Sequence, residues 1–228
     1  NTQTIVRMEG GISIGRLEQE RASAMRVNTA ESKRAATGRE LEIARNAIGF
    51  YGYNNGNGRT YGLLNAPGLL PYITAAGGEW SAGDFQSIKN CILKGFQTLR
   101  VQSMDRVDPG TDLITIVLPT TAIDYMAQAT DLGVSVLDWL RGAYSNVRIV
   151  SAPEMMEANA GQSAMYMFAD SVRDSGTDDG KTWAQVVPTK FMTLGVEQKT
   201  KGYEEAYTNA TAGVMCKRPY AVARFTGI

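Results

Sequence analysis

The 228-residue sequence contains no histidine, and this absence restricts the chemistry open to the chain. Without an imidazole, the chain cannot supply Ser-His-Asp or Cys-His catalysis. It also lacks histidine metal ligands and the usual proton carrier near neutral pH. The composition therefore excludes these classes of catalytic and metal site.

Cysteine is scarce as well, because only Cys91 and Cys216 occur and neither has a CxxC partner. Isolated cysteines of this kind usually behave as small buried hydrophobic residues. We expect both to stay unpaired in a chain of intracellular, reducing origin, and a disulfide between them is the alternative.

The sequence has neither long hydrophobic runs nor an excess of charge of one sign. No run of about 18 apolar residues occurs, so we expect no membrane-spanning helix. The start lacks the pattern of a signal peptide, and Asn1 in place of methionine indicates a processed chain or a fragment. Basic and acidic residues number 23 each. Without a concentrated basic face, we expect no sequence-specific nucleic-acid binding.

Two glycine-containing segments are similar to phosphate-binding loops but have the wrong spacing. NGNGRTYG, residues 55–62, is one residue too long for the dinucleotide fingerprint, and no predicted strand precedes it. GTDDGKT, residues 176–182, has three residues between its glycines where a P-loop needs four. Two of the three are aspartates, Asp178 and Asp179, which repel phosphate. We therefore expect no nucleotide or other cofactor, and an exposed acidic turn at these aspartates.

Carboxylates are the remaining catalytic resource of the sequence. Glu154 with Glu157, and Glu204 with Glu205, could in principle form an acid–base pair. Neighbouring residues of a strand point to opposite faces, so Glu204 and Glu205 cannot act together on one substrate. A hydrolase that uses Glu154 or Glu157 is a remote alternative to a chain without catalytic or metal-binding residues.

Hydrophobic periodicity predicts two long helices in the first half of the chain. Asn28 and Thr29 are suitable N-caps for a helix that extends to about Ile48. Ser81-x-x-Asp84 is a capping signal for the second helix. The apolar face of this second helix, expected to pack as a domain core under a sheet of C-terminal strands, consists of Phe85, Ile88, Ile92, Phe96 and Leu99. Residues 51–80 lack periodicity and are predicted to be loop.

Two finer expectations concern the first fifty residues. The β-prone run at 2–15 is predicted to break at Gly10-Gly11. Glu31 and Arg34 are three residues apart in the first long helix, so their opposite charges can meet on its exposed side.

The second half of the chain alternates strands with helices and then becomes extended. DLITIVLP, VRIVSAP and AMYMFAD are predicted strands of a compact α/β layer at 110–170, with helices at TTAIDYMAQAT and SVLDWLRGAYSN. From Lys190 onward, FMTLGVEQ, GYEEAYTNATAGVMC and YAVARF are expected to form a mainly antiparallel sheet separate from that layer. The predicted fold class is therefore α+β.

The order of these elements resembles the major capsid proteins of tailed bacteriophages, whose fold encapsulin nanocompartment shells share. YGLLNAPG at 61–68 is similar to the family's link after its spine helix. SVLDWLRGAYSN at 135–146 resembles the axial-domain helix, and VRIVSAPE follows it. KRPYAVARFTGI at 217–228 resembles the terminal strand. The resemblance covers the whole chain and implies a structural protein, not an enzyme.

The resemblance implies a long spine helix, a discontinuous peripheral domain and an α/β axial domain. Residues 1–27 correspond to a remnant of the extended loop and a short helix. Residues 28–105 with 193–228 correspond to the peripheral domain, including the spine helix, and 106–192 to the axial domain. A long N-terminal arm and the first half of the extended loop precede these segments in the family. Their absence here is expected to reflect maturation cleavage or truncation.

The implied function is self-assembly into pentamers and hexamers of an icosahedral phage head that encloses DNA. The implied partners are other copies of the chain, a scaffold or maturation protease, a portal and a decoration protein, in a virion assembled in the host bacterial cytoplasm. An encapsulin-like compartment that holds enzyme cargo is the alternative within the same fold. A neighbouring terminase, portal and prohead protease, as against a peroxidase or ferritin-like cargo, distinguishes the two.

The glycine-rich loop gains a role from this resemblance. Neighbouring copies in a shell supply the contacts that long loops do not find in their own core. We therefore expect a packing role within or between subunits for Tyr61, Leu63, Leu64 and Asn65. A purely local turn is the alternative.

Covalent crosslinks between subunits occur in the wider superfamily and require a lysine, an asparagine and a nearby acid. Lys199, Lys201 and Asn57 are present, but the sequence does not place them together. We expect mature shells to release single chains when they are boiled in detergent.

Overall fold

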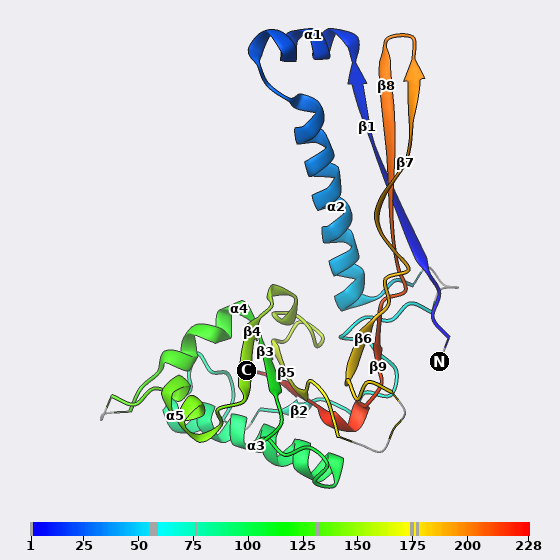
Figure 1. Cartoon of the computed structure of the whole chain (residues 1–228). Helices are drawn as coiled ribbons and strands as arrows, with labels where there is room; N and C mark the ends of the chain where they lie inside the picture. The colour runs from blue at the N-terminus through cyan, green and yellow to red at the C-terminus, as the bar shows by residue number, and fades with distance from the viewer. Residues whose placement is uncertain (1, 55–58, 76, 131–132, 174–175, 177) are drawn as a thin grey trace. The chain divides into compact units, whose positions relative to one another are not determined.

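The computed structural model describes the chain except for residues 1, 55–58, 76, 131–132, 174–175 and 177. The chain forms two compact units, and each is made of segments that are far apart in the sequence (Figure 1). The first unit contains Asn1–Ala66 and Gln185–Met215, and the second contains Pro67–Ala184 and Cys216–Ile228.

A three-stranded antiparallel sheet is the framework of the first unit. Its strands are β1 (Val6–Gly15), β7 (Thr189–Lys199) and β8 (Gly202–Thr211), in the order β1-β8-β7. β1 pairs with β8 without interruption, from Val6 opposite Thr211 to Gly15 opposite Gly202. In Figure 1, β1 in blue runs beside β8 in orange, although β1 lies at the opposite end of the sequence.

Two helices accompany this sheet. α1 (Arg16–Met25) follows β1 directly, and α2 (Thr29–Tyr51) then runs along one face of the sheet (Figure 1). Asn28 is the N-cap of α2, as predicted, because its side-chain oxygen accepts a 3.1 Å hydrogen bond from the N–H of Glu31. The side chains buried between α2 and the strands are Ile12, Ile14, Leu41 and Tyr207.

β1 is continuous through Gly10 and Gly11, so the predicted break at these residues is wrong. The two glycines pair with Tyr207 and Ala206 of β8. A Cβ atom added at Gly10 would lie 3.0 Å from Cγ2 of Thr37 in α2. Glycine at this position therefore permits close approach of helix and strand, and it does not end the strand.

A five-stranded mixed sheet is the framework of the second unit. In the order β2-β10-β5-β3-β4, its strands are β2 (Ile73–Thr74), β10 (Val222–Thr226), β5 (Ala164–Ala169), β3 (Ile114–Leu118) and β4 (Val147–Ser151). β3 pairs parallel with β4 and antiparallel with β5, whereas β10 pairs antiparallel with β5 and parallel with β2. β3 and β5 are almost wholly buried, and strands covered on both faces have near-continuous apolar sequences.

The terminal strand β10 belongs to this sheet, so the prediction that all C-terminal strands lie apart from the α/β layer is wrong for β10. Val222 and Ala223 are 1% exposed and Phe225 is fully buried. Ala223 and Phe225 belong to one core with residues of β3, β5 and helix α3 (Phe85–Ser103). Closing a longer loop adds little entropy cost, so burial of these side chains outweighs their distance in the sequence.

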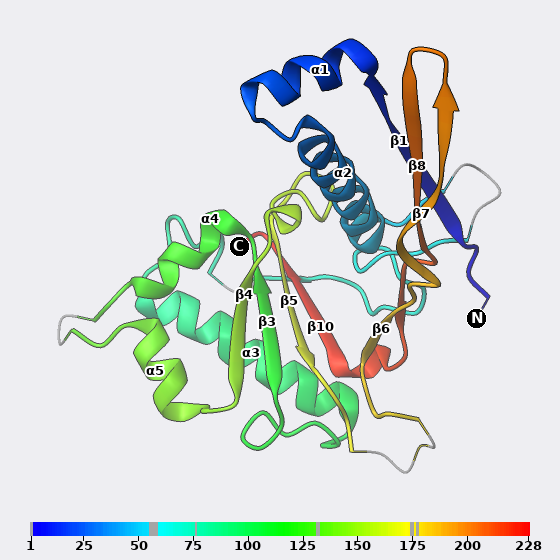
Figure 2. The same cartoon turned by 45° about the horizontal axis from the view of Figure 1, so that its top comes forward.

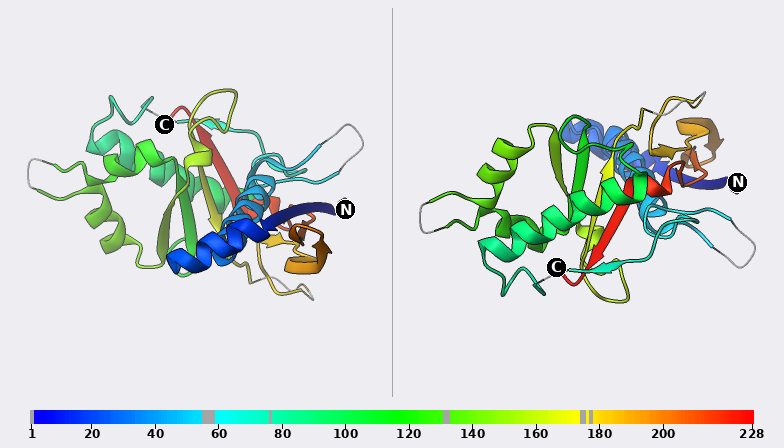
Figure 3. Two further views of the ribbon diagram at one scale, coloured as in Figure 1. Left: turned by 90° about the horizontal axis from the view of Figure 1, so that it is seen from above. Right: turned by 90° about the horizontal axis from the view of Figure 1, so that it is seen from below.

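Helices α3 and α5 (Val136–Ala143) pack on this sheet, and α3 crosses one of its faces (Figures 2 and 3). The N-cap of α3 is Asp84, whose carboxylate accepts a 2.8 Å hydrogen bond from the N–H of Ser87. α5 begins with a capping box, in which the side chains of Ser135 and Asp138 each accept a hydrogen bond from the backbone N–H of the other.

The remaining elements are short. The helix predicted for TTAIDYMAQAT is instead a single α turn followed by a 3-10 turn. The short elements are α4 (Thr120–Ile123), η1 (Asp124–Ala127), η2 (Pro153–Met155), β6 (Trp183–Gln185), β9 (Val214–Cys216) and η3 (Pro219–Ala221). β6 and β9 pair with each other. In the described part of the chain, no helix is both long and apolar enough to cross a membrane.

The two cysteines behave as the sequence predicts. Cys91 and Cys216 are both buried and both free. Burial raises the pKa of each thiol to about 11, so neither is a reactive thiolate near neutral pH.

The boundaries of the two compact units differ from those of the domains that the resemblance implies. The resemblance assigns 28–105 with 193–228 to one domain and 106–192 to another. In the structure, α3 and β10 share one buried core with β3 and β5. Peripheral and axial describe positions in an assembled shell, so the assignment of those two names stays a prediction.

Candidate functional site

The residues predicted to form a core on α3 lie in the second unit. Ile88, Ile92 and Leu99 are fully buried, and Phe96 is 3% exposed. Phe85 is half-buried against the same cluster, which includes residues of β3, β5 and β10. That this core belongs to a peripheral domain stays a prediction.

The carboxylates considered for catalysis are spread over the chain. Glu154 is half-buried in η2, and Glu157 is exposed just beyond it. Glu204 and Glu205 lie on opposite faces of β8, as predicted, since Glu205 is 5% exposed and the Glu204 side chain is 42% exposed. Among the described residues, no group of three or more His, Cys, Asp or Glu could hold a metal ion.

Glu205 joins β8 to α2 through a buried ionic contact. Nε of Arg34 donates a 2.7 Å hydrogen bond to this carboxylate, and Nη2 of Arg34 donates a second one. The hydroxyl of Tyr207 also donates to it. The hydrogen bonds from Arg34 and Tyr207 lower the pKa of Glu205 from 4.5 to about 2 and outweigh the opposing effect of burial. The sequence predicted Glu31 as the partner of Arg34, but Glu31 accepts a hydrogen bond from Asn28 instead.

The predicted packing loop bonds to the C-terminal end of α2. The N–H groups of Leu63 and Leu64 donate to two carbonyl oxygens near that end, at 2.8 and 3.0 Å. The side-chain amide of Asn65 donates to the carbonyl oxygen of Tyr51 at 2.9 Å. The last carbonyl groups of a helix have no partner within the helix, so this segment satisfies them.

The same segment lies very close to the helix backbone. Tyr61 and the two leucines are half-buried, whereas Asn65 is exposed. A Cβ atom at Gly62 would lie 2.3 Å from the carbonyl oxygen of Phe50, so a larger residue does not fit there. These contacts are within one chain and reach beyond a local turn, and packing between copies stays a prediction. Residues 55–58 of the glycine-rich run lie outside the described residues.

The acidic turn at 176–182 is bound to the C-terminal segment of the second unit. Nη2 of Arg218 donates a 2.6 Å hydrogen bond to Asp178, and Nζ of Lys217 donates one of 2.7 Å to Asp179. These hydrogen bonds lower the pKa of both carboxyl groups. The prediction of a merely exposed turn misses both ion pairs, because the partners are 40 and 38 residues away in the sequence.

The lysines considered for crosslinking lie at and beside the turn between β7 and β8. Nζ of Lys199 is 2.5 Å from Oε2 of Glu204, and this hydrogen bond raises the pKa of Lys199. Lys201 is exposed in the turn itself. Asn57, the asparagine considered with them, lies outside the described residues.

Strand β7 exposes a long apolar edge. It is an edge strand of the sheet, and every residue after Thr189 is exposed. Its large hydrophobic side chains, between 40% and 58% exposed, are Phe191, Met192, Leu194 and Val196. Long, exposed hydrophobic edge strands tend to pair with another chain. The sequence predicts strand β7, but no signal in the sequence indicates that its apolar side chains are exposed to solvent.

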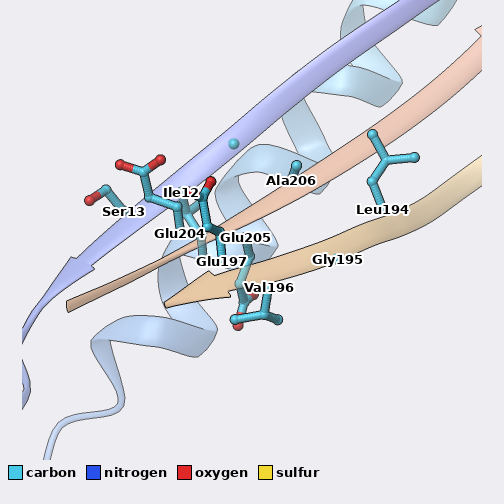
Figure 4. Close-up of a pocket in the computed structure, with 10 residues that line it drawn as sticks. Ile12, Ser13, Leu194, Gly195, Val196, Glu197, Glu204, Glu205 and Ala206 are labelled. Atoms are coloured by element: carbon cyan, nitrogen blue, oxygen red, sulfur yellow. The ribbon is translucent and has the colours of Figure 1, made fainter. Parts of the chain in front are cut away.

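A shallow hollow of about 620 Å³ lies beside β7, on the face of the sheet turned away from α2 (Figure 4). Glu205 points toward α2 to meet Arg34, so its neighbour Ala206 points to the other face. Gly11 and Gly195 lie opposite Ala206 on the flanking strands. Three residues with almost no side chain therefore form the floor, and we call this site the β7 hollow.

The rim of the β7 hollow combines apolar and acidic side chains. Glu197 lies opposite Glu204 in the register, and Glu204 lies opposite Ser13, so this row borders the floor. Figure 4 shows Leu194 and Glu204 rising on one side of the sheet, whereas Val196 points to the other. The hollow thus has a flat floor, an apolar wall and an acidic end. Such a surface suits a protein partner better than a small substrate, because the hollow is open and would leave much of a small ligand in solvent.

The arrangement of the described residues is similar to that of known shell proteins. The capsid of Myoviridae phage XM1 has a TM-score of 0.78 and 18% identity, over 99% of this chain and 74% of that chain. The capsid of an empty GTA particle has a TM-score of 0.62 and 13% identity, over 98% and 73%. A virus-like particle from Pyrococcus furiosus has a TM-score of 0.55 and 10% identity, over 97% and 75%. No curated protein sequence matches the chain.

These structural likenesses establish the fold, and they confirm the phage major-capsid fold that the resemblance implied. The family comes from the sequence itself, because the profile of the Pa193 gp26 major capsid protein matches residues 1–227. With that match over nearly its whole length, the chain belongs to the family of the Pa193 gp26 major capsid protein.

Proposed function

We propose that this chain is the structural subunit of a phage head and works by assembling with copies of itself. The observation that carries the proposal is the family match over residues 1–227. The capsid fold along 99% of the chain supports it. In this function the copies form pentamers and hexamers of an icosahedral shell that encloses DNA.

The surface of the first unit supports a function in assembly. The exposed apolar edge of β7 and the β7 hollow offer area that a second protein can bury. Each contact can be weak, because closed symmetry repeats it many times in one particle. The formal charge of zero suits a wall that must not hold DNA strongly.

We further propose that the chain acts without catalysing a reaction. A scaffold or maturation protease, a portal and a decoration protein are its proposed partners, and assembly takes place in the host bacterial cytoplasm. A screen of glycoside and ester substrates tests the absence of catalysis. Turnover that Glu154→Gln abolishes would contradict it.

Electron microscopy of the full-length protein, expressed together with its neighbouring genes, tests assembly. We expect closed shells in which fivefold and sixfold clusters are visible. Monodisperse single chains from the full-length protein contradict the proposal.

An encapsulin-like compartment is a second candidate, because the Pyrococcus furiosus virus-like particle shares the fold. The contents of purified shells distinguish the two functions. Nuclease-protected DNA supports the phage head, whereas an enclosed peroxidase or ferritin-like protein supports the compartment. The neighbouring genes give an independent answer.

We also propose that the shell is held by noncovalent contacts. Lys199 is bonded to Glu204 in its own chain, which occupies one of the lysines considered for crosslinking. Mature shells boiled in detergent should release single chains. A ladder of multimers that survives reduction contradicts this proposal.

A further inference from the structure

Helix α1 has little packing within the described part of its own chain. Of its 10 residues, Ala22 is the one that is buried. Nζ of Lys33 in α2 lies 2.7 Å from the carboxylate of Glu18, so an ion pair also holds the helix. Isolated helices shorter than about 12–15 residues are marginal in water. A second surface that covers α1 would therefore stabilise it.

The outward face of α1 carries apolar side chains, the cation Arg21 and the acidic Glu20, whose carboxylate pairs with Arg16 at 3.4 Å. Residues spaced by three, four, seven or eight positions share a face of a helix. By this rule, one face carries Leu17, Arg21, Ala24 and Met25, and we call it the α1 stripe. All four residues are exposed, with Leu17 at 69% and Met25 at 75%.

The β7 hollow complements this stripe in shape and in charge. Its floor has no side chain larger than a methyl group, so a helix can approach the sheet closely. Leu194, which is 45% exposed, provides an apolar wall. Lys199 pairs with Glu204 at the acidic end, and Glu197, opposite Glu204 in the register, adds a second carboxylate there. Arg21 carries the opposite charge.

The α1 stripe cannot occupy the β7 hollow of its own chain. α1 turns from the end of β1 toward the side of the sheet that carries α2 (Figures 1 and 2). The contact between Glu18 and Lys33 of α2 holds it on that side. The β7 hollow opens on the opposite face, where Glu204 rises from the sheet (Figure 4).

We propose that the β7 hollow of one copy receives the α1 stripe of a second copy. Leu17 then packs against Leu194, and Arg21 lies beside Glu197 and Glu204. This contact joins two different surfaces of one chain, and a heterologous contact of this kind closes into a ring when the rotation between neighbouring copies divides a full turn. The inference rests on the proposed function, because it requires that copies of the chain assemble.

Disulfide trapping in assembled shells tests the contact directly. The variant that combines Leu17→Cys with Leu194→Cys should give a ladder of linked chains on a non-reducing gel, and reductant should remove it. The native cysteines, Cys91 and Cys216, are buried and do not compete. Each single variant should give single chains. The control pair, Leu17→Cys with Met104→Cys, should do the same, since Met104 is 84% exposed in the other unit.

Charge reversal tests the same contact without cysteines. Arg21→Glu and Glu197→Arg should each lower the yield of shells several-fold, and the double variant should restore most of it. Arg39→Glu, an exposed position on α2, is the matched control and should leave the yield unchanged. The melting temperature of unassembled chains should not change in any of these variants, which separates assembly from folding.

The outcomes separate this inference from the proposed function. Shells of the Leu17→Cys and Leu194→Cys variant that release only single chains without reductant overturn the contact and leave the proposed function intact. If the cysteine pair blocks assembly, the charge-reversal pair decides, and failure to restore the yield overturns the contact. If the unsubstituted full-length chain forms no shells, the proposed function fails and the inference fails with it.

Discussion

Strands of the two sheets of this chain differ widely in burial, and β7 lies at one extreme while β3 and β5 lie at the other. In the second unit, β3 and β5 are buried at nearly every position. In the first unit, β7 is exposed at every position after Thr189. All three strands carry large apolar side chains, so hydrophobicity alone does not reveal which strand its own chain covers. We infer that β3 and β5 hold the subunit together, whereas the edge strand β7 is open to a partner.

The buried cores beneath the two sheets also differ, in size and in the kind of contact that each contains. The second unit joins α3, α5 and its sheet in one large cluster of buried apolar residues. The first unit has a small core around Ile12, Ile14 and Leu41, and it adds the ionic contact between Glu205 and Arg34. Removal of apolar volume should therefore affect the second unit most, and removal of charge should affect the first unit.

The largest expected effect is loss of volume in the apolar core. Phe96→Ala removes a side chain that is 3% exposed and packs against Tyr144 with ring centroids 4.4 Å apart. Truncation of a buried Phe costs about 3–5 kcal/mol of unfolding free energy. Denaturant unfolding measures it, with Met104→Ala, at an 84% exposed position, as the control. Equal, small effects from both changes would contradict the position of this core.

The ionic contact of the first unit should matter less than the apolar core. Glu205→Ala removes the hydrogen bonds of Arg34 and Tyr207 to a carboxylate that is 5% exposed. Hydrogen bonds to charged groups contribute about 1.5–3 kcal/mol. The neighbouring change Glu204→Ala, on the opposite face of β8, should lower the stability much less. Thermal melting of both variants checks the difference, and a larger loss from Glu204→Ala would contradict the contact.

The same contact predicts a dependence on pH. The folded pKa of Glu205 is about 2 and its ordinary value is 4.5, so folding favours the ionised form. Its contribution is complete above pH 4.5 and is lost as the pH falls toward 2. The stability difference between the unsubstituted chain and Glu205→Ala should therefore shrink over this range. Unfolding titrations of both proteins test this, and a constant difference would contradict it.

The acidic turn of the second unit should show a smaller effect. Asp178 contacts Arg218, which is 5% exposed, whereas Asp179 contacts Lys217, which is more exposed. Asp178→Ala should therefore lower the melting temperature measurably, and Asp179→Ala should lower it less. The sequence alone predicts little effect from either change. Equal melting temperatures for both variants and the unsubstituted chain would support that simpler prediction.

The smallest effect on folding should come from the exposed strand. Met192 is 48% exposed on β7, so Met192→Lys should change the unfolding free energy by no more than about 0.5 kcal/mol. The same change should reduce the yield of shells, because the charge must be desolvated in an interface. Sedimentation of the assembled fraction measures the yield. Full assembly by this variant would contradict a role of β7 in contacts between subunits.

Local signals in the sequence predicted much of the fold. The cap Asn28 forms as expected, because its side chain bonds a backbone N–H only three residues away. The unpaired, buried cysteines and the opposite faces of Glu204 and Glu205 also follow from residue type and strand geometry. The predictions that failed depend on distant partners. Arg34 bonds to Glu205, which is 171 residues away in the sequence, and not to Glu31, which is three residues away.

By itself, the sequence determined the family, the positions of most helices and strands, and the absence of histidine-based chemistry. Tertiary structure alone decided that β10 joins the buried sheet, that Gly10 lies inside a continuous strand, and that β7 stays exposed at every position after Thr189. The physical reason is that periodicity and capping act over a few residues, whereas burial depends on which distant segments meet. An apolar side chain on β7 and one on β5 obey the same local rules, and only the fold decides which of them remains exposed.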